Sequence, residues 1–208
     1  MGRGERRPTT VIDLAVVAAV TVGIGIASGA LRGFPKGYDA LGHLAKVRLL
    51  LAAWPHLNWN DSWYGGLPNF TGSYPPGYHL LVAAFSFCFR ISIESAMLVV
   101  TGLSFVLVTT GSYALVRLVT RSRYAAWIAT LALIAEPTLW DQSLQLGLYP
   151  RLLSLGFGAA GAAAAAGYGR TRSRWWSLAM VLSLGASLSA HPVVGVMCTV
   201  FAAAVIWA

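Results

Sequence analysis

The chain has 208 residues, of which 57% are hydrophobic and only 11% are charged. Soluble domains carry about 25% charged residues, so the composition excludes an ordinary soluble protein and indicates an integral membrane protein. The formal net charge of +8 does not indicate nucleic-acid binding, because the basic residues form short clusters between apolar runs, as topology signals do. These clusters are Arg3, Arg6 and Arg7; Arg117, Arg121 and Arg123; and Arg170, Arg172 and Arg174.

The first apolar run, residues 12–31, is long enough to cross a hydrocarbon core of about 30 Å. No small-residue cleavage site closes this run, so we interpret it as a retained span and not as a signal peptide. Arginine clusters favour the cytoplasmic side of a membrane. Residues 1–10 are therefore predicted to be cytoplasmic, and residues 32–93 to form a long extracytoplasmic loop of a multi-pass cell-membrane protein.

The next apolar run, residues 76–89, is shorter than the roughly 20 residues of a span. If it crossed the membrane, the arginines at 117–123 would lie outside, against the positive-inside rule. We therefore predict interfacial helices near 39–53 and 76–90 within the outer loop. The predicted fold is all-α, a polytopic transmembrane helical bundle. Its predicted spans are residues 12–31, 96–116, 124–140, 148–168, 175–190 and 193–208, the last of which stops without a polar tail, as in the front part of a longer protein.

The outer loop opens with GYDALGHLAKVRLL, which places Asp39, His43 and Lys46 at helical spacing. These three residues are predicted to form one polar stripe, with Leu41 and Leu44 on the other side of the helix. An acidic residue beside a histidine can serve as a general base, a metal ligand pair or a simple ion pair, and Asp39 is also suited to capping the helix. Asp39 and His43 are thus candidate catalytic residues and candidate ligands of Mg²⁺ or Mn²⁺, although the sequence requires no cofactor.

Further polar residues are predicted on the same side of the membrane. The segment LIAEPTLWDQ places Glu136 and Asp141 at the outer end of the third predicted span, where a carboxylate is costly unless it is paired or solvated. The segment GLYPRLL places Arg151 at headgroup depth, where it can bind a phosphate bidentately or extend to lipid phosphates. His191 returns to this side and is either a polar residue at a helix end or a substrate contact.

Four short motifs follow one another between residues 32 and 192. They are Gly37/Asp39/His43, Tyr74-Pro75-Pro76, Gly147-Leu148-Tyr149-Pro150-Arg151 and His191-Pro192. In this order they resemble the GT-C superfamily of membrane glycosyltransferases, and within it the membrane proteins described as "6-pyruvoyl-tetrahydropterin synthase-related". The chain departs from many members of the superfamily, because Asp39 is followed by Ala40 where they have a second acidic residue.

The resemblance implies an enzyme that moves a sugar from a polyprenyl-phosphate donor to a glycan, lipid or protein acceptor at the extracytoplasmic face. It implies Asp39 as the general base, His43 as its partner, and Glu136 or Asp141 as a second acidic residue. The residues expected to contact substrate are Lys46, Trp59, Trp63, Tyr64, Tyr74, Arg151 and His191. The alternative is a non-catalytic membrane protein that handles a lipid carrier or transports a solute, although the predicted spans offer few polar residues to line a path.

Overall fold

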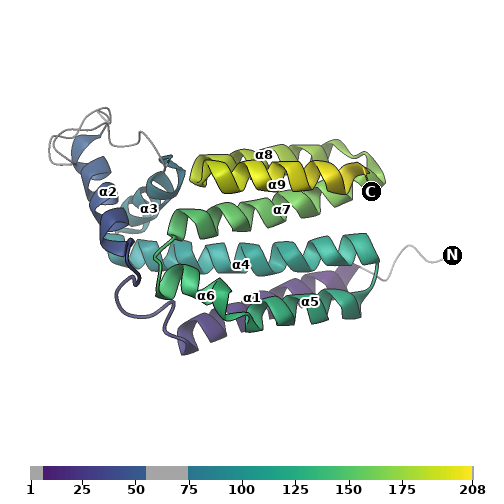
Figure 1. Cartoon of the computed structure of the whole chain (residues 1–208), viewed down its shortest axis with the longest axis horizontal. Helices are drawn as coiled ribbons and strands as arrows, with labels where there is room; N and C mark the ends of the chain where they lie inside the picture. Colours follow the sequence, from purple (N-terminus) through teal and green to yellow (C-terminus); the bar gives the residue numbers. More distant parts are fainter. Residues whose placement is uncertain (1–6, 55–74, 208) are drawn as a thin grey trace.

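The protein is described from a computed structural model that defines residues 7–54 and 75–207 (Figure 1). Within these two ranges the secondary structure is entirely helical, as the sequence predicts. The helices are α1 (Arg7–Ala27), α2 (Ala40–Ala53), α3 (Gly77–Phe89), α4 (Ile93–Thr120), α5 (Arg123–Ala135), α6 (Pro137–Leu144), α7 (Tyr149–Thr171), α8 (Arg174–Ala190) and α9 (Pro192–Trp207).

Three helices, α1 from Thr10 onward, α4 and α7, are long and apolar enough to cross a membrane. They correspond to the spans predicted at 12–31, 96–116 and 148–168. The other predicted spans correspond to α5, α8 and α9, which have 13, 17 and 16 residues. The helices α2 and α3 coincide with the two short helices predicted in the first loop. The apolar composition and the three long helices indicate a membrane protein.

The helix expected over residues 124–140 is interrupted at Glu136, where α5 ends and α6 begins. Proline has no backbone N–H and favours extended backbone in the residue before it. Glu136 accordingly has φ −74° and ψ 115°. Its carboxylate accepts hydrogen bonds from the backbone N–H of Thr138 at 3.3 Å and from the Thr138 hydroxyl at 3.0 Å. Pro137 thus divides the expected helix in two, and Glu136 becomes the exposed N-cap of the second part.

The long helices run side by side along the molecule, whereas α2 and α3 lie across one end (Figure 1). The centre of the bundle is the pair α4 and α7, with α8 and α9 packed on α7, and α1 and α5 packed on α4. Small residues permit this close approach. A Cβ added to Gly111 of α4 would lie 2.8 Å from the backbone nitrogen of Ala160 in α7. The run of alanines at residues 162–166 is buried in the same helix.

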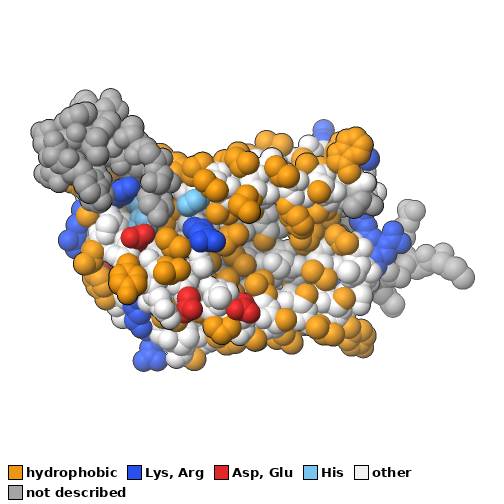
Figure 2. All heavy atoms as spheres, in the orientation of Figure 1, with side chains coloured by type: hydrophobic (Ala, Val, Ile, Leu, Met, Phe, Trp, Pro, Cys, Tyr) orange, Lys and Arg blue, Asp and Glu red, His pale blue; other side chains and the backbone are white. Residues whose placement is uncertain are grey.

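The two ends of the bundle carry different elements (Figure 1). At one end, here called the polar end, lie α2, α3, α6 and the α8–α9 turn. At the other, here called the arginine end, lie the α4–α5 and α7–α8 turns with their arginine clusters. On the face in Figure 2, the acidic and histidine side chains lie in the half toward the polar end. The arrangement therefore separates the predicted site residues from the predicted topology signals.

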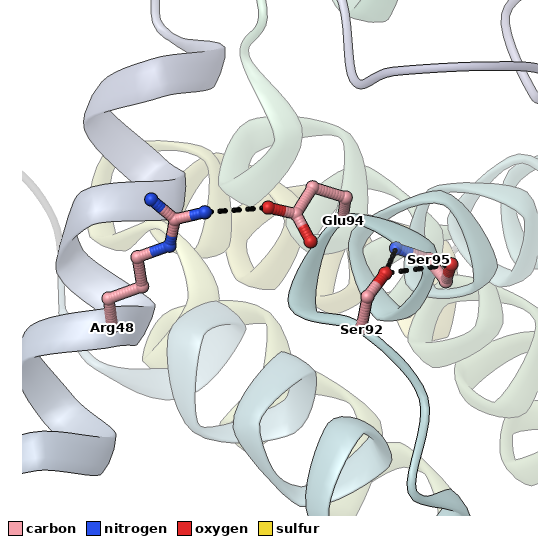
Figure 3. A network of polar contacts seen from close by, with 4 residues as sticks. All are labelled: Arg48, Ser92, Glu94 and Ser95. Atoms are coloured by element: carbon pink, nitrogen blue, oxygen red, sulfur yellow. Dashed lines mark hydrogen bonds and ion pairs between the residues drawn. The ribbon is translucent and has the colours of Figure 1, made fainter.

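An exposed ion pair joins α2 to the start of α4 at the polar end (Figure 3). Arg48 Nη2 lies 2.7 Å from Glu94 Oε1. Beside this pair, Ser92 caps α4, because its hydroxyl oxygen accepts the backbone N–H of Ser95 at 3.1 Å. An exposed pair of this kind contributes about 0–1 kcal/mol, so the position of α2 depends mainly on its buried face.

Candidate functional site at the polar end

Two glycine loops hold the start of α2 against the start of α7. Gly37 and Gly147 have φ values of +95° and +68°, in the left-handed region that favours glycine. A Cβ added to Gly37 would overlap the backbone nitrogen of Gly147. The Asp39 N–H donates to the Leu146 carbonyl at 3.3 Å. The Tyr149 hydroxyl donates to the Lys36 carbonyl in the first loop. The first and third motifs, far apart in sequence, are therefore adjacent.

A buried histidine pair joins α2 to α3. His43 Nδ1 and His79 Nε2 are 3.1 Å apart, and the two side chains are 3% and 0% exposed. The rings of Tyr78 and Tyr149 lie against them, with centroids 5.8 and 5.9 Å from that of His43, and they stack on each other at 6.1 Å. These four residues, here called the histidine–tyrosine cluster, come from the first motif, the helix after the Tyr-Pro-Pro turn, and the third motif.

Burial keeps both histidines of the cluster neutral at physiological pH. Loss of solvation lowers the pKa of His43 to about 4, and the charge of Lys46 acts in the same direction, against a hydrogen bond with the backbone of Gly147. Burial, followed by the influence of His43 and Lys46, holds the pKa of His79 well below its ordinary value. A neutral imidazole has one N–H donor and one acceptor nitrogen, so one ring donates to the other.

The polar stripe predicted on α2 is divided between two faces. Asp39 is exposed and Lys46 is half-buried, but His43 lies on the buried face together with Leu44, while Leu41 is 65% exposed. The expectation that His43 and Leu44 lie on opposite sides is wrong. The buried positions recur every three or four residues and pack α2 onto α3 and α4, and this face includes the histidine.

Asp39 and Lys46 form the charged part of α2. Asp39 occupies the N-cap position, but its side chain makes no capping hydrogen bond. Burial lowers the pKa of Lys46, and the negative charge of Asp39 acts in the opposite direction. The carboxylate of Asp39 is thus exposed at the start of a helix, in electrostatic contact with a half-buried ammonium group.

The third and fourth motifs meet at the start of α7. Arg151 is exposed in the first turn of this helix. Its charge, after the effect of burial, lowers the pKa of His191. The Ser154 hydroxyl donates to the Ser187 carbonyl at 2.9 Å and reaches the His191 carbonyl at 3.3 Å. At the polar end the charge of Arg151 therefore acts on His191, and His43 contacts His79.

The two candidate second acids differ in their surroundings. Glu136 is engaged in capping α6. Asp141, also in α6, accepts a hydrogen bond from Gln145 Nε2 at 3.2 Å, and its carbonyl accepts the backbone N–H groups of Gln145 and Leu146. The Leu146 carbonyl in turn accepts the Asp39 N–H. Asp141 is therefore connected through the backbone to the Asp39 loop.

Within residues 7–54 and 75–207, no three His, Cys, Asp or Glu side chains are grouped so that they could hold a metal ion. For the candidate metal ligands Asp39 and His43, the structure instead shows His43 Nδ1 in contact with His79. The predicted substrate contacts Trp59, Trp63, Tyr64 and Tyr74 lie outside the described residues.

An apolar groove of about 490 Å³ runs along α7 away from the polar end. Small residues of α7, among them Gly158 and Ala162, line this groove together with residues of α4 and α9. Among the described residues that line the groove, Arg151 alone is charged. The larger lining side chains include Leu115, Leu139, Leu155, Val194, Met197 and Phe201.

Two buried polar residues, His79 and Asp13, were not predicted from the sequence. His79 follows the Tyr-Pro-Pro turn, and no periodic pattern marks its partner in α2. Asp13 is 2% exposed in α1; it accepts two hydrogen bonds from Arg123 at 2.7 and 2.9 Å and one from the Tyr113 hydroxyl at 2.6 Å. An ionisable residue inside an apolar span is costly unless it is paired, and this signal was available in the sequence.

The parts of all four motifs that the structure describes thus come together at one end of the bundle, next to an apolar groove with a cation at its end. No curated protein and no solved structure matches the chain. A family model matches residues 2–208, almost the whole chain. The chain therefore belongs to the family described as "Family of unknown function (DUF6541)".

Proposed function

We propose that the chain is the membrane module of a GT-C-type glycosyltransferase, which moves a sugar from a polyprenyl-phosphate donor to an acceptor on the extracytoplasmic face. The observation that carries this proposal is the apolar groove along α7 that ends at Arg151. A polyprenyl phosphate combines a long hydrocarbon with an anion, so it needs an apolar groove and a cation at the end of that groove. The groove and Arg151 fit both parts.

The size of the groove supports a lipid occupant. Pockets that enclose small molecules have volumes of about 300–1,000 Å³, and this groove has about 490 Å³. It can accommodate the first isoprene units of the donor, while the rest of the chain extends into the bilayer. Arg151 is close to the Asp39 loop through the contact of Gly37 with Gly147, so a phosphate at Arg151 would place the sugar near Asp39.

In the proposed reaction, the bond between the sugar C1 and the phosphate oxygen breaks and a bond between C1 and the acceptor oxygen forms. Asp39 takes the proton of the acceptor hydroxyl as general base. The electron pair of the broken bond remains on the polyprenyl phosphate, whose charge is stabilised by Arg151. Lys46 holds the Asp39 carboxylate by charge, and Asp141 is the second acid that positions the acceptor. His43 is buried, so its role is to hold α2 in place through His79.

The direct test is a transfer assay on the full-length protein with labelled polyprenyl-phosphate sugars, with and without Mg²⁺ or Mn²⁺. Asp39→Asn should abolish transfer at unchanged expression. Arg151→Gln should weaken donor use, whereas Arg90→Gln, an exposed arginine at the end of α3, serves as the matched control. Transfer that persists in Asp39→Asn removes this residue from the base role. Binding of polyprenyl phosphate without transfer of any sugar would favour a lipid-carrier protein instead.

The groove has its own matched pair of variants on α9. Met197 lines the groove and is 67% exposed, so Met197→Trp would fill it without disturbing the core. Val196 is 54% exposed and lies outside the lining, so Val196→Trp adds the same side chain elsewhere. Donor binding should fall in the first variant and not in the second. Equal binding by both would show that the lipid does not occupy the groove.

A further inference from the structure

A second hollow, of about 380 Å³, lies at the arginine end and is lined by residues at the ends of α4 and α7 and by residues of α9. Its walls combine two guanidinium groups with aliphatic side chains. The larger lining residues are Leu118, Val119, Arg121, Arg170, Val205 and Ile206. No acidic residue is among the described residues that line it. The hollow lies at the opposite end from Asp39, so a ligand bound there is independent of the proposed sugar transfer.

The electrostatic balance of this hollow decides which ligand it suits. The C-terminal ends of α4 and α7 meet here, and each carries at most about half a negative charge. Two arginines line the hollow, Arg121 and Arg170, and each carries a full positive charge. Arg117 donates a hydrogen bond to the Arg121 carbonyl at 2.5 Å, so one carbonyl at the C-terminal end of α4 has a hydrogen-bond partner. The arginines exceed the helix ends, so the hollow attracts anions.

The depth of the hollow matches the lipid headgroup region. The 28 residues of α4 span about 42 Å at 1.5 Å per residue. A bilayer measures about 30 Å across its hydrocarbon core and 40–45 Å with its headgroups. The end of α4 therefore reaches headgroup depth when the other end is at the opposite interface. Val119 and Val205 then face the outermost acyl carbons, with Arg121 and Arg170 at the rim.

We propose that this hollow is a binding site for an anionic phospholipid, whose phosphate lies between Arg121 and Arg170 and whose acyl chains pack on the aliphatic wall. A guanidinium pairs well with phosphate oxygens in two parallel hydrogen bonds. A zwitterionic lipid such as phosphatidylcholine is disfavoured, because the arginines repel its positively charged choline group. Free phosphate lacks the acyl chains that the aliphatic wall accommodates.

The test is lipid titration of the purified full chain in detergent, with bound lipid counted by native mass spectrometry. Phosphatidylglycerol should bind more tightly than phosphatidylcholine. Each arginine near a lipid surface contributes about fivefold in affinity. The double variant Arg121→Gln, Arg170→Gln should therefore bind phosphatidylglycerol about 25-fold more weakly. Gly169 lines the hollow, and a Cβ added there meets Ile206 only at 3.8 Å, so Gly169→Leu would fill the space at unchanged charge and should also lose the lipid.

The matched control removes the same charge outside the hollow. Arg172 and Arg174 lie over the rings of Tyr168 and Trp175 at 5.3 and 5.2 Å and are not part of the lining. The double variant Arg172→Gln, Arg174→Gln should bind phosphatidylglycerol less than about fivefold more weakly than the wild type. The charges of these two arginines act on the hollow only through solvent, which screens them. Equal losses in the two double variants, tight binding by Gly169→Leu, or competition by inorganic phosphate at the same concentrations as the lipid would overturn the proposal.

Discussion

Acidification is expected to loosen α2 from α3, because it forces a proton onto a buried histidine pair. His43 has a pKa of about 4 in the folded protein, against 6.5 for an exposed histidine. Since the folded pKa is the lower of the two, the unfolded state takes up the proton first as the pH falls. Stability is intact above pH 6.5 and is lost progressively between about pH 6.5 and 4. Burial lowers the pKa of His79 in the same direction, so His79 adds to the loss of stability below pH 6.5.

The size of this effect follows from the two pKa values of His43. At about 1.4 kcal/mol per pKa unit, full protonation costs about 3 kcal/mol. At pH 5.0 the loss from His43 alone is about 2 kcal/mol, which corresponds to a fall of about 4–8 °C in the unfolding midpoint for a chain of this length.

The assay is thermal unfolding in detergent at pH 7.5 and 5.0, with amide hydrogen exchange of residues 40–53 and 77–89 as the local readout. The double variant His43→Gln, His79→Gln keeps hydrogen-bonding groups but cannot be protonated, and it should lose most of the difference between the two pH values. His191→Gln, at the same end but half-buried, should retain most of it. If the double variant shows the full wild-type difference, the histidine pair is not the source.

Three further predictions concern stability, measured as the unfolding midpoint in detergent. Gly37→Ala should destabilise the protein much more than Gly33→Ala, because both glycines have positive φ but only Gly37 would overlap a neighbouring backbone; similar effects would contradict the close approach of the two loops. Asp13→Asn should lower the midpoint by several degrees, because it removes the charge that Arg123 binds; no change would argue against this ion pair. Arg48→Gln should cost at most about 1 kcal/mol, because its ion pair is exposed, and a larger loss would assign that pair a structural role.

The sequence was sufficient to predict the helices but not the contacts between them. Apolar runs and short loops indicated the helical elements, and the order of the motifs indicated which residues belong together. The break at Glu136 was also readable, since Pro137 disfavours a helix through the preceding residue. The face of α2 that carries His43 was not readable, because its partner His79 comes from a separate helix. A histidine buried by a tertiary hydrogen bond looks the same in sequence as one on a polar stripe.

The sidedness of the two ends is the claim on which the proposed function depends. It is tested by placing single cysteines through Asp39→Cys or Arg121→Cys in a chain in which Cys88 and Cys198 are replaced by serine, and by labelling sealed right-side-out vesicles with a membrane-impermeant maleimide. We predict that position 39 is labelled in intact vesicles and that position 121 is labelled only after permeabilisation. Labelling of both positions in intact vesicles, or of neither, would contradict the proposed sidedness.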